Sequence, residues 1–374
     1  MPDWNWGKLP LKAVADVYDG PHATPDKTDS GPWYLNIGSL QSGRLMLAES
    51  AHLSEEDFLR WTRRVRPVEG DVLFSYETRL GEAAMMPAGL RACLGRRMGL
   101  LRPRRDRLDP RFLLYAYLGP EFQGTISQRM VHGATVERIP ISEVGDWEVA
   151  VPPLPEQRAI AEVLGALDDK IEANRNVIET AWALAEADFE RVTASSETRE
   201  LGNLLQLAYG KGLPAESRAA GNIPVWGSGG VVGFHNEALV NGPGIVVGRK
   251  GSVGTVYWCK EDFFPIDTTF YVTKPHIPLI FAYFTLRSLG LGHMNSDSAV
   301  PGLNRSAAYA RLVRVPAAGE LEAFCRTAEP LAELVGAAEQ ETAWLAGLRD
   351  ALLPKLLSGE LRVRDAESLV GEAV

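Results

Sequence analysis

Arginine supplies most of the binding chemistry in this sequence. The stretch "RACLGRRMGLLRPRRDR" (91–107) holds seven arginines and a single acid, Asp106. A guanidinium group donates paired hydrogen bonds to a phosphate or to the O6/N7 edge of guanine. The run therefore predicts contacts with a nucleic acid; the alternative is a solvated loop face whose charges balance nearby acids. The arginines taken as candidate contacts are Arg96, Arg97, Arg104 and Arg105.

A second cationic loop lies in "GPGIVVGRKGSVGTVYW" (242–258). Arg249, Lys250 and Ser252 stand among glycines, which let the backbone approach a phosphate closely. The loop is not a Walker loop, because no Gly-Lys-Ser/Thr follows at the required spacing. We predict that these three side chains contact nucleic acid.

Three further stretches, "WYLNIGSL", "VWGSGGVVGFHN" and "RMVHGATVER", combine polar and aromatic residues that can meet bases. A lone His or Trp is more often packed in the structure than exposed to a ligand. The glycines of "GSGGVVG" lack the GxGxxG spacing, so they predict a loop and not a dinucleotide site. The weaker candidates are Tyr34, Asn36, Ser39, Trp226, Ser228, His235, Asn236, His132 and Thr135.

The net charge of -9 is unevenly distributed. Segments 153–199 and 317–374 carry -5 and -6, whereas 1–152 carries -1 and 200–316 carries +3. A bound polyanion responds to local charge, so the acidic total does not exclude a nucleic-acid partner.

The first acidic segment predicts one long helix. Pro155 suits the first helical turn, and no proline follows before Val192. The apolar period is 3.5 residues, as in a coiled coil, and about 38 residues give a rod of roughly 57 Å. A long buried helix of one globular domain is the alternative, but a charged outer face argues against burial on all sides. The seam residues are Ile160, Leu164, Leu167, Ile171 and Ile178.

The second acidic segment predicts a similar helix from Pro330 at heptad spacing. A shorter helix over 320–329 is expected to lead into it, with a bend at Pro330. Pro354 and Gly359 punctuate its end. The seam residues are Leu331, Val335, Leu345 and Leu352.

The two globular stretches repeat each other. "LKAVADVYDG" from Leu11 matches "LGNLLQLAYG" from Leu201, and "DVLFSYETRLG" from Asp71 matches "GIVVGRKGSVG" from Gly244. The offset between matched positions falls from 190 to 164 along the stretch, so the first carries about 26 extra residues in its loops. Short β-branched runs between Gly and Pro predict compact, strand-rich units.

The repeat pairs the loop at Arg249 with a loop in the first block. Different polar residues at equivalent positions are what the reading of two different sites requires. The first-block candidates in this loop are Ser75, Tyr76, Thr78 and Arg79.

These observations predict an α+β fold with two similar globular domains separated by two long helices. The helices form an antiparallel coiled coil, and a pseudo-twofold axis relates the two halves. The segments are 1–152 (first block), 153–199 (first helix), 200–316 (second block) and 317–374 (second helical region and C-terminal tail).

The sequence resembles the specificity subunits of type I restriction–modification systems. The resemblance spans nearly the whole chain in the family's order, although "PLPEQ" at the first helix has no counterpart at the second. The stretches that carry it are "VADVYDGPHATP", "PLPEQRAIAEVLGALDDKIEANR", "YGKGLPA", "IPVWGSGGVVGFHN", "GPGIVVGRKGSVGTVYW", "PIDTTFYV", "VPGLNR" and "LRDALLPKLLSGEL". Within "VPGLNR", Asn304 and Arg305 join the candidate DNA contacts.

The resemblance implies two target-recognition domains, each reading one half of a split, asymmetric site in double-stranded DNA. It implies two methyltransferase subunits as partners, and nuclease/translocase subunits where a restriction activity is present. S-adenosylmethionine, and ATP with Mg, are then expected on the partners and no cofactor on this chain.

The sequence favours a non-catalytic chain. "VPPLP" (151–155) has no Asn or Asp before its prolines, unlike an adenine methyltransferase loop, and no metal cluster is evident. Two alternatives stay open: a coiled-coil scaffold whose blocks bind protein, and an enzyme with an unrecognised site. Three scattered cysteines and no membrane-length apolar run predict a cytoplasmic protein without a membrane partner.

Overall fold

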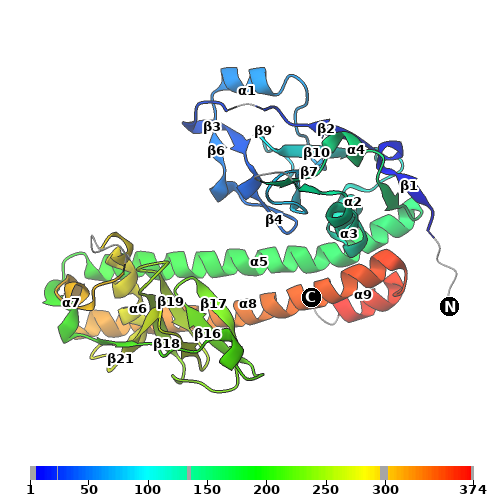
Figure 1. The fold of residues 1–374 in the computed structure, drawn as a ribbon. Helices are drawn as coiled ribbons and strands as arrows, with labels where there is room; N and C mark the ends of the chain where they lie inside the picture. Colours follow the sequence, from blue (N-terminus) through cyan, green and yellow to red (C-terminus); the bar gives the residue numbers. More distant parts are fainter. Residues whose placement is uncertain (1–5, 23, 133–135, 295–301, 372–374) are drawn as a thin grey trace. The chain divides into compact units, whose positions relative to one another are not determined.

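The computed structural model describes residues 6–22, 24–132, 136–294 and 302–371. The chain divides into two compact units, the first made of 1–172 and 343–374 and the second of 173–342. Each unit contains one globular block and a part of each long helix (Figure 1). Among the described helices, none combines the length and the apolar character that a membrane span requires.

The first block is built on a four-stranded antiparallel sheet in the order β2-β10-β7-β8. A three-stranded sheet, β6-β3-β9, and three two-stranded pairs, β1-β13, β4-β5 and β11-β12, complete it. Its strands are β1 Lys8–Pro10, β2 Ala15–Asp19, β3 Thr28–Leu35, β4 Leu40–Gln41, β5 Arg44–Leu45, β6 Ala51–His52, β7 Val72–Ser75, β8 Ala83–Met85, β9 Ala92–Leu94, β10 Met98–Pro103, β11 Val131–His132, β12 Glu137–Arg138 and β13 Glu148–Ala150. Its helices are α1 Glu55–Trp61, α2 Pro110–Leu118, α3 Pro120–Arg129 and α4 Ile141–Val144.

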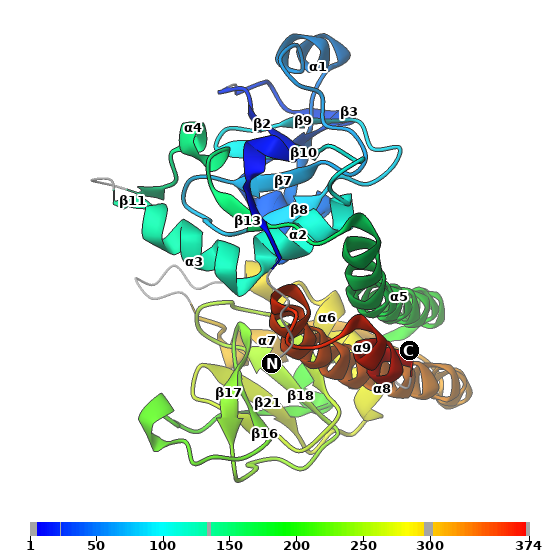
Figure 2. The same cartoon turned by 90° about the vertical axis from the view of Figure 1, so that its right-hand side faces the viewer.

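Helix α2 joins the first block's sheet to the long helices. Asp109 caps its N-terminus by accepting from the backbone of Arg111 and Phe112, and Pro110 occupies its first turn. One side of α2 covers the sheet, and the other meets α5 (Figure 2), where Tyr115 donates to Asp168 (2.6 Å).

The second block repeats this design with fewer residues in its loops. Its sheets are β15-β21-β18-β19, β17-β16-β20 and β14-β22. Its strands are β14 Glu197–Glu200, β15 Gln206–Tyr209, β16 Ile223–Gly227, β17 Gly230–His235, β18 Gly244–Gly248, β19 Val256–Cys259, β20 Phe264–Pro265, β21 Thr269–Thr273 and β22 Leu312–Val315. Its helices are α6 Leu279–Ser288 and α7 Arg305–Tyr309.

The strand orders confirm the internal repeat predicted from the sequence. In each block a first strand pairs with the last, and an edge strand begins a four-stranded antiparallel sheet. The three-stranded sheet of each block also has one parallel pair, β3 with β9 and β16 with β20. The predicted α+β fold with two similar blocks and two long helices is confirmed.

The long helices are α5, Leu154–Thr193, and α8, Ala318–Ser358. In the first unit the seam residues Ile160, Leu164, Leu167 and Ile171 are buried, as are Leu345 and Leu352. In the second unit Asn174 donates to Glu341 (2.7 Å), and the ring of Phe189 lies 5.9 Å from that of Phe324. A later residue of α5 thus contacts an earlier residue of α8, so the two helical segments run antiparallel in this unit.

The two helices begin differently. Gln157 of "PLPEQ" is fully buried; its side chain accepts from Asp109 N (2.8 Å) and donates to the carbonyls of Arg107 and Pro152. The motif therefore fastens the start of α5 to the first block. The entry to α8, "VPAAGELEAF", has no glutamine for this role.

The expectation of a separate helix over 320–329 was wrong. Helix α8 runs without interruption from Ala318 through Pro330 to Ser358. Proline removes one backbone hydrogen bond, but Ala328 and Ala332 on either side are both buried in the same core. Packing on both sides of Pro330 outweighs the local break. The C-terminal tail also contains a helix, α9 Val363–Gly371, which packs on the first unit's core.

Candidate nucleic-acid interface

The loops that follow β7 and β18 are held by matching backbone hydrogen bonds. In the first block Tyr76 donates to the Arg97 carbonyl (3.0 Å), and in the second Arg249 donates to the Thr268 carbonyl (2.9 Å). Two further backbone bonds also match. Ile139 N donates to Tyr76 O (2.9 Å) in the first block, and Leu303 N donates to Arg249 O (2.9 Å) in the second. Likewise, Ser75 N donates to Glu82 O (3.1 Å), and Gly248 N donates to Thr255 O (2.8 Å). The loops thus share a backbone frame, and position 76 corresponds to 249.

Backbone torsions match at the tips of these loops. Thr78 has φ +73° where Gly251 has φ +78°, and Gly81 has φ +85° where Gly254 has φ +79°. Such angles are rare for residues other than glycine, so Thr78 is held there by the surrounding frame. The turn is conserved between the blocks although its side chains differ.

In the second block the frame gathers an aromatic ring and two arginines. The guanidinium carbons of Arg249 and Arg305 lie 5.2 Å and 4.9 Å from the ring centroid of Tyr209. Arg249 also donates to the Asp267 carbonyl (2.7 Å), and Arg305 donates to the Leu207 carbonyl (3.1 Å). These contacts fix both cationic groups in place.

No carboxylate within 4.0 Å pairs with Arg249, Lys250 or Arg305 among the described residues. Lys250 is exposed, and a Cβ added at Gly251 would meet Ser228 Oγ at 3.1 Å, so the Ser228 turn lies beside this loop. The candidates Arg249, Lys250, Ser252, Ser228 and Arg305 therefore come together as one cluster of uncompensated positive charge, the cationic cluster. Such a cluster suits an anionic ligand.

The first block carries different groups at the same positions. Asp19 corresponds to Tyr209, and Tyr76, which is buried, corresponds to Arg249. Burial, and then the nearby Asp19 carboxylate, raise the pKa of Tyr76 well above its usual value. Asp19 Oδ2 also lies 3.4 Å from His22 Nε2 and 3.9 Å from Arg64 Nη1. The centre of this site is therefore a carboxylate, with a guanidinium group and an imidazole ring beside it.

The arginine run is largely engaged within the first block. Arg105 donates to the Glu69 carbonyl (2.6 Å), and Arg96 is exposed. The ion pairs are Arg91–Glu55 (2.7 Å), Arg97–Glu77 (3.0 Å), Arg102–Asp71 (2.7 Å), Arg104–Asp16 (2.8 Å) and Arg107–Asp106 (4.0 Å). This arrangement agrees with the alternative of a charge-balanced loop face, and DNA contact by these arginines stays a prediction.

Several weaker candidates have structural contacts. Asn36 and Ser39 form a capping box on a short helical turn. The side chain of Asn304 caps α7 by accepting from Ala307 N (3.1 Å). His235 is buried, with Nδ1 3.1 Å from Ala219 N, and the Trp226 ring packs on Tyr257.

The remaining candidates are scattered. Ser75 is buried and donates to the Glu77 carbonyl (2.9 Å). Arg79 pairs with Glu82 (3.6 Å). Tyr34 is half-buried and Asn236 is exposed. Thr135 lies outside the described residues, and of His132 only the backbone, in β11, is described.

Sequence reasoning missed Tyr209. It stands in "LAYG", directly opposite Asp19 of "VYDG" in the aligned repeat. The signal was a change from carboxylate to aromatic inside an otherwise matched strand. Its meaning depends on Arg305, which is distant in sequence and reaches the ring only in the folded chain.

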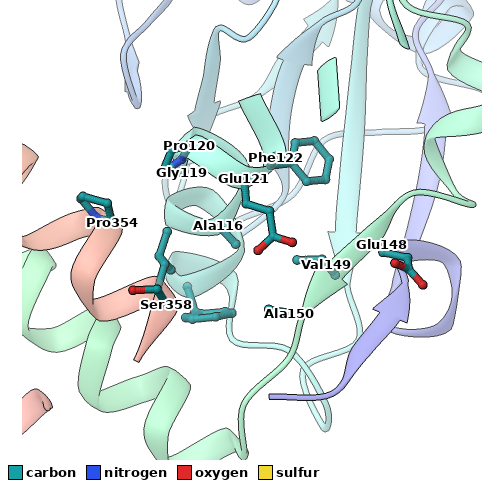
Figure 3. A pocket seen from close by; sticks show the side chains of 12 residues that line it. Ala116, Gly119, Pro120, Glu121, Phe122, Glu148, Val149, Ala150, Pro354 and Ser358 are labelled. Carbon is teal, nitrogen blue, oxygen red and sulfur yellow. The ribbon is translucent and has the colours of Figure 1, made fainter. Parts of the chain in front are cut away.

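A separate hollow lies between α2, α3, β13 and the end of α8 in the first unit (Figure 3). Its walls include Phe112, Val149 and Leu357, and the carboxylates of Glu121 and Glu148 also line it. The volume is about 90 Å³, below the several hundred Å³ of a typical ligand site. It contains none of the predicted site residues.

The pKa values of the three cysteine thiols argue against thiolate chemistry. Burial raises the pKa of Cys93 to about 12 and that of Cys325 to about 11, and it also raises the pKa of Cys259. All three thiols are therefore protonated at neutral pH. Within the described residues no group of three His, Cys, Asp or Glu side chains is placed to hold a metal ion.

Residues 31–180 match the family model described as the type I restriction modification DNA specificity domain. This segment is therefore similar to a type I DNA specificity domain. The resemblance predicted from the sequence is confirmed. The matched segment begins within β3, continues through β13 and includes more than half of α5.

Known proteins that are similar to the chain include a curated relative and a solved structure. The type I restriction enzyme MjaX specificity subunit of Methanocaldococcus jannaschii is 30% identical over 107 residues, which is 28% of this chain and 24% of that protein. The chain therefore matches about a quarter of that relative's length. The crystal structure of the type I restriction-modification system S subunit from M. genitalium has a TM-score of 0.63 at 21% identity, covering 95% of this chain and 97% of that one. This second likeness shows that the fold is shared.

Proposed function

We propose that this chain is the sequence-specific DNA-recognition subunit of a type I restriction–modification complex. Each block reads one half of a bipartite, asymmetric site. The chain itself is non-catalytic and directs partner subunits that methylate adenine or cleave DNA, in the cytoplasm.

The observation that carries the proposal is one backbone frame presenting two different sets of side chains. Among the described residues, Arg249, Lys250 and Arg305 of the second block have no carboxylate partner, whereas the first block places Asp19 at the equivalent point. Phosphate contacts supply affinity for DNA, and base contacts supply sequence. Two frames with different groups then read two different half-sites.

The long helices are proposed to set the gap between half-sites and to dock two methyltransferase subunits. The 40 residues of α5 give a rod of about 60 Å, between one and two turns of duplex at about 34 Å each. The cofactors, S-adenosylmethionine and ATP with Mg, belong to the partners in this scheme.

The test is to co-express the chain with the methyltransferase subunit encoded beside it and to map methylated adenines across the host DNA. A single split motif, two short halves around a fixed gap, is the expected result. An intact co-purified complex that methylates nothing would contradict DNA recognition and favour the scaffold alternative.

A further inference from the structure

Tyr209 is an exposed aromatic residue at the centre of the cationic cluster. It is 52% exposed although the ring packs on Phe270, with centroids 4.9 Å apart. Leaving an aromatic ring in water forgoes much of its burial free energy. The position therefore serves something other than the core.

The two guanidinium groups depend on this ring. Arg249 and Arg305 come from different segments, yet both lie within 5.2 Å of the ring centroid. The negative face of an aromatic ring attracts each cation, which offsets the repulsion between them. A backbone carbonyl holds each arginine as well, so little side-chain freedom is left to lose when a ligand binds.

We infer that Tyr209 is a positioning residue that holds Arg249 and Arg305 as a preorganised pair for one phosphate of the DNA strand at the second half-site. This inference rests on the proposed function. A phosphate is the ligand because the pair and the neighbouring Lys250 have no carboxylate partner among the described residues. The first block has Asp19 at the matched position, where a carboxylate would repel a phosphate.

The experiment uses the full chain with its co-expressed methyltransferase subunit and a duplex that carries the motif methylated by the wild type. The dissociation constant is measured over a series of salt concentrations. Tyr209→Leu is expected to weaken binding about tenfold, because the ring's hold on both cations is lost. The slope of log Kd against log salt stays as in the wild type, since no charge is removed, whereas Arg249→Ala lowers it by about one.

Tyr209→Phe is the matched control, because it keeps the ring and removes only the hydroxyl. It is expected to bind within about twofold of the wild type, and a double variant, Tyr209→Leu with Arg249→Ala, should lose less than the sum of the single losses. Unchanged melting temperatures show that the variants fold. Wild-type affinity for Tyr209→Leu, or equal losses for the Phe and Leu variants, would overturn the positioning role.

A second duplex, in which the second half-site is scrambled, tests whether the arginine pair binds a phosphate or a base edge. A phosphate contact predicts that Tyr209→Leu weakens binding to both duplexes by the same factor. A loss confined to the intact motif would assign the pair to a base edge and overturn the phosphate assignment. If the wild-type complex itself showed no salt-dependent binding to the duplex, that result would instead contradict the proposed function.

Discussion

The two blocks share one backbone frame and differ in how they treat their charges. In the first block Arg97, Arg102 and Arg104 each have a carboxylate partner. In the second, Arg249 and Arg305 rest on Tyr209 and have none among the described residues. The number of arginines in a segment therefore does not show how many of them lack a carboxylate partner.

The first test of this comparison concerns Asp71, the buried carboxylate of the first block. Asp71 is 1% exposed; it accepts from Arg102 and from Val68 N (2.8 Å). Asp71→Ala leaves these donors without partners and should destabilise the first unit by about 3 kcal/mol. Hydrogen exchange of the amides in each unit measures the effect. Asp106→Ala, at an exposed pair, should change nothing measurable; equal exchange in both variants would deny Asp71 this role.

The second test concerns the unpaired cations. Arg249→Ala with Lys250→Ala should weaken binding at the second half-site about 100-fold, because two charge-assisted contacts are lost. Footprinting of each half-site on the intact duplex separates the halves, because a phosphate contact is lost whatever the base sequence. Arg97→Ala with Arg104→Ala is the matched variant of the first block and should lose far less at its half-site. Equal losses at both half-sites would contradict the assignment of the cluster to one of them.

The third test concerns the matched turns. A Cβ at Gly254 would overlap the backbone of Gly292, and φ is +79° there. Gly254→Ala should destabilise the second unit by about 2 kcal/mol. Gly81→Ala in the first block meets only the side chain of Gln123, which can move, and should cost about half as much. Urea unfolding followed by hydrogen exchange compares them; a larger cost at Gly81 would mean that the turns are not equivalent.

The smallest expected effect lies at the edge strands. The hydroxyl of Tyr309 accepts from Leu207 N (2.7 Å). At the repeat offset of 164, the first block has Gly145 in place of Tyr309, and a hollow lies beside the edge strand β2. Tyr309→Phe should cost about 1 kcal/mol, because this amide loses its acceptor. Gly145→Tyr has ordinary contacts for its Cβ and should stabilise the first unit by a similar amount. Thermal unfolding checks both; a neutral Tyr309→Phe would mean that water replaces the hydroxyl.

Periodic and local features could be predicted from the sequence. The 3.5-residue spacing on Leu164, Leu167 and Ile171 predicted a long helix, and the repeat predicted two blocks with one frame. Both signals are carried by residues near one another in the chain, where spacing alone decides which face is apolar. The structure also brings Arg249, Ser252 and Ser228 together, and their contact with DNA stays a prediction.

The tertiary structure alone decided which charges are compensated. Arg104 meets Asp16, 88 positions away, and Arg102 meets Asp71, 31 positions away. Only the tertiary structure places Arg249 and Arg305 against the ring of Tyr209. Only the tertiary structure shows that α8 continues through Pro330. Each outcome depends on contacts between segments far apart in the chain, whose free energies exceed the local preferences that a sequence displays.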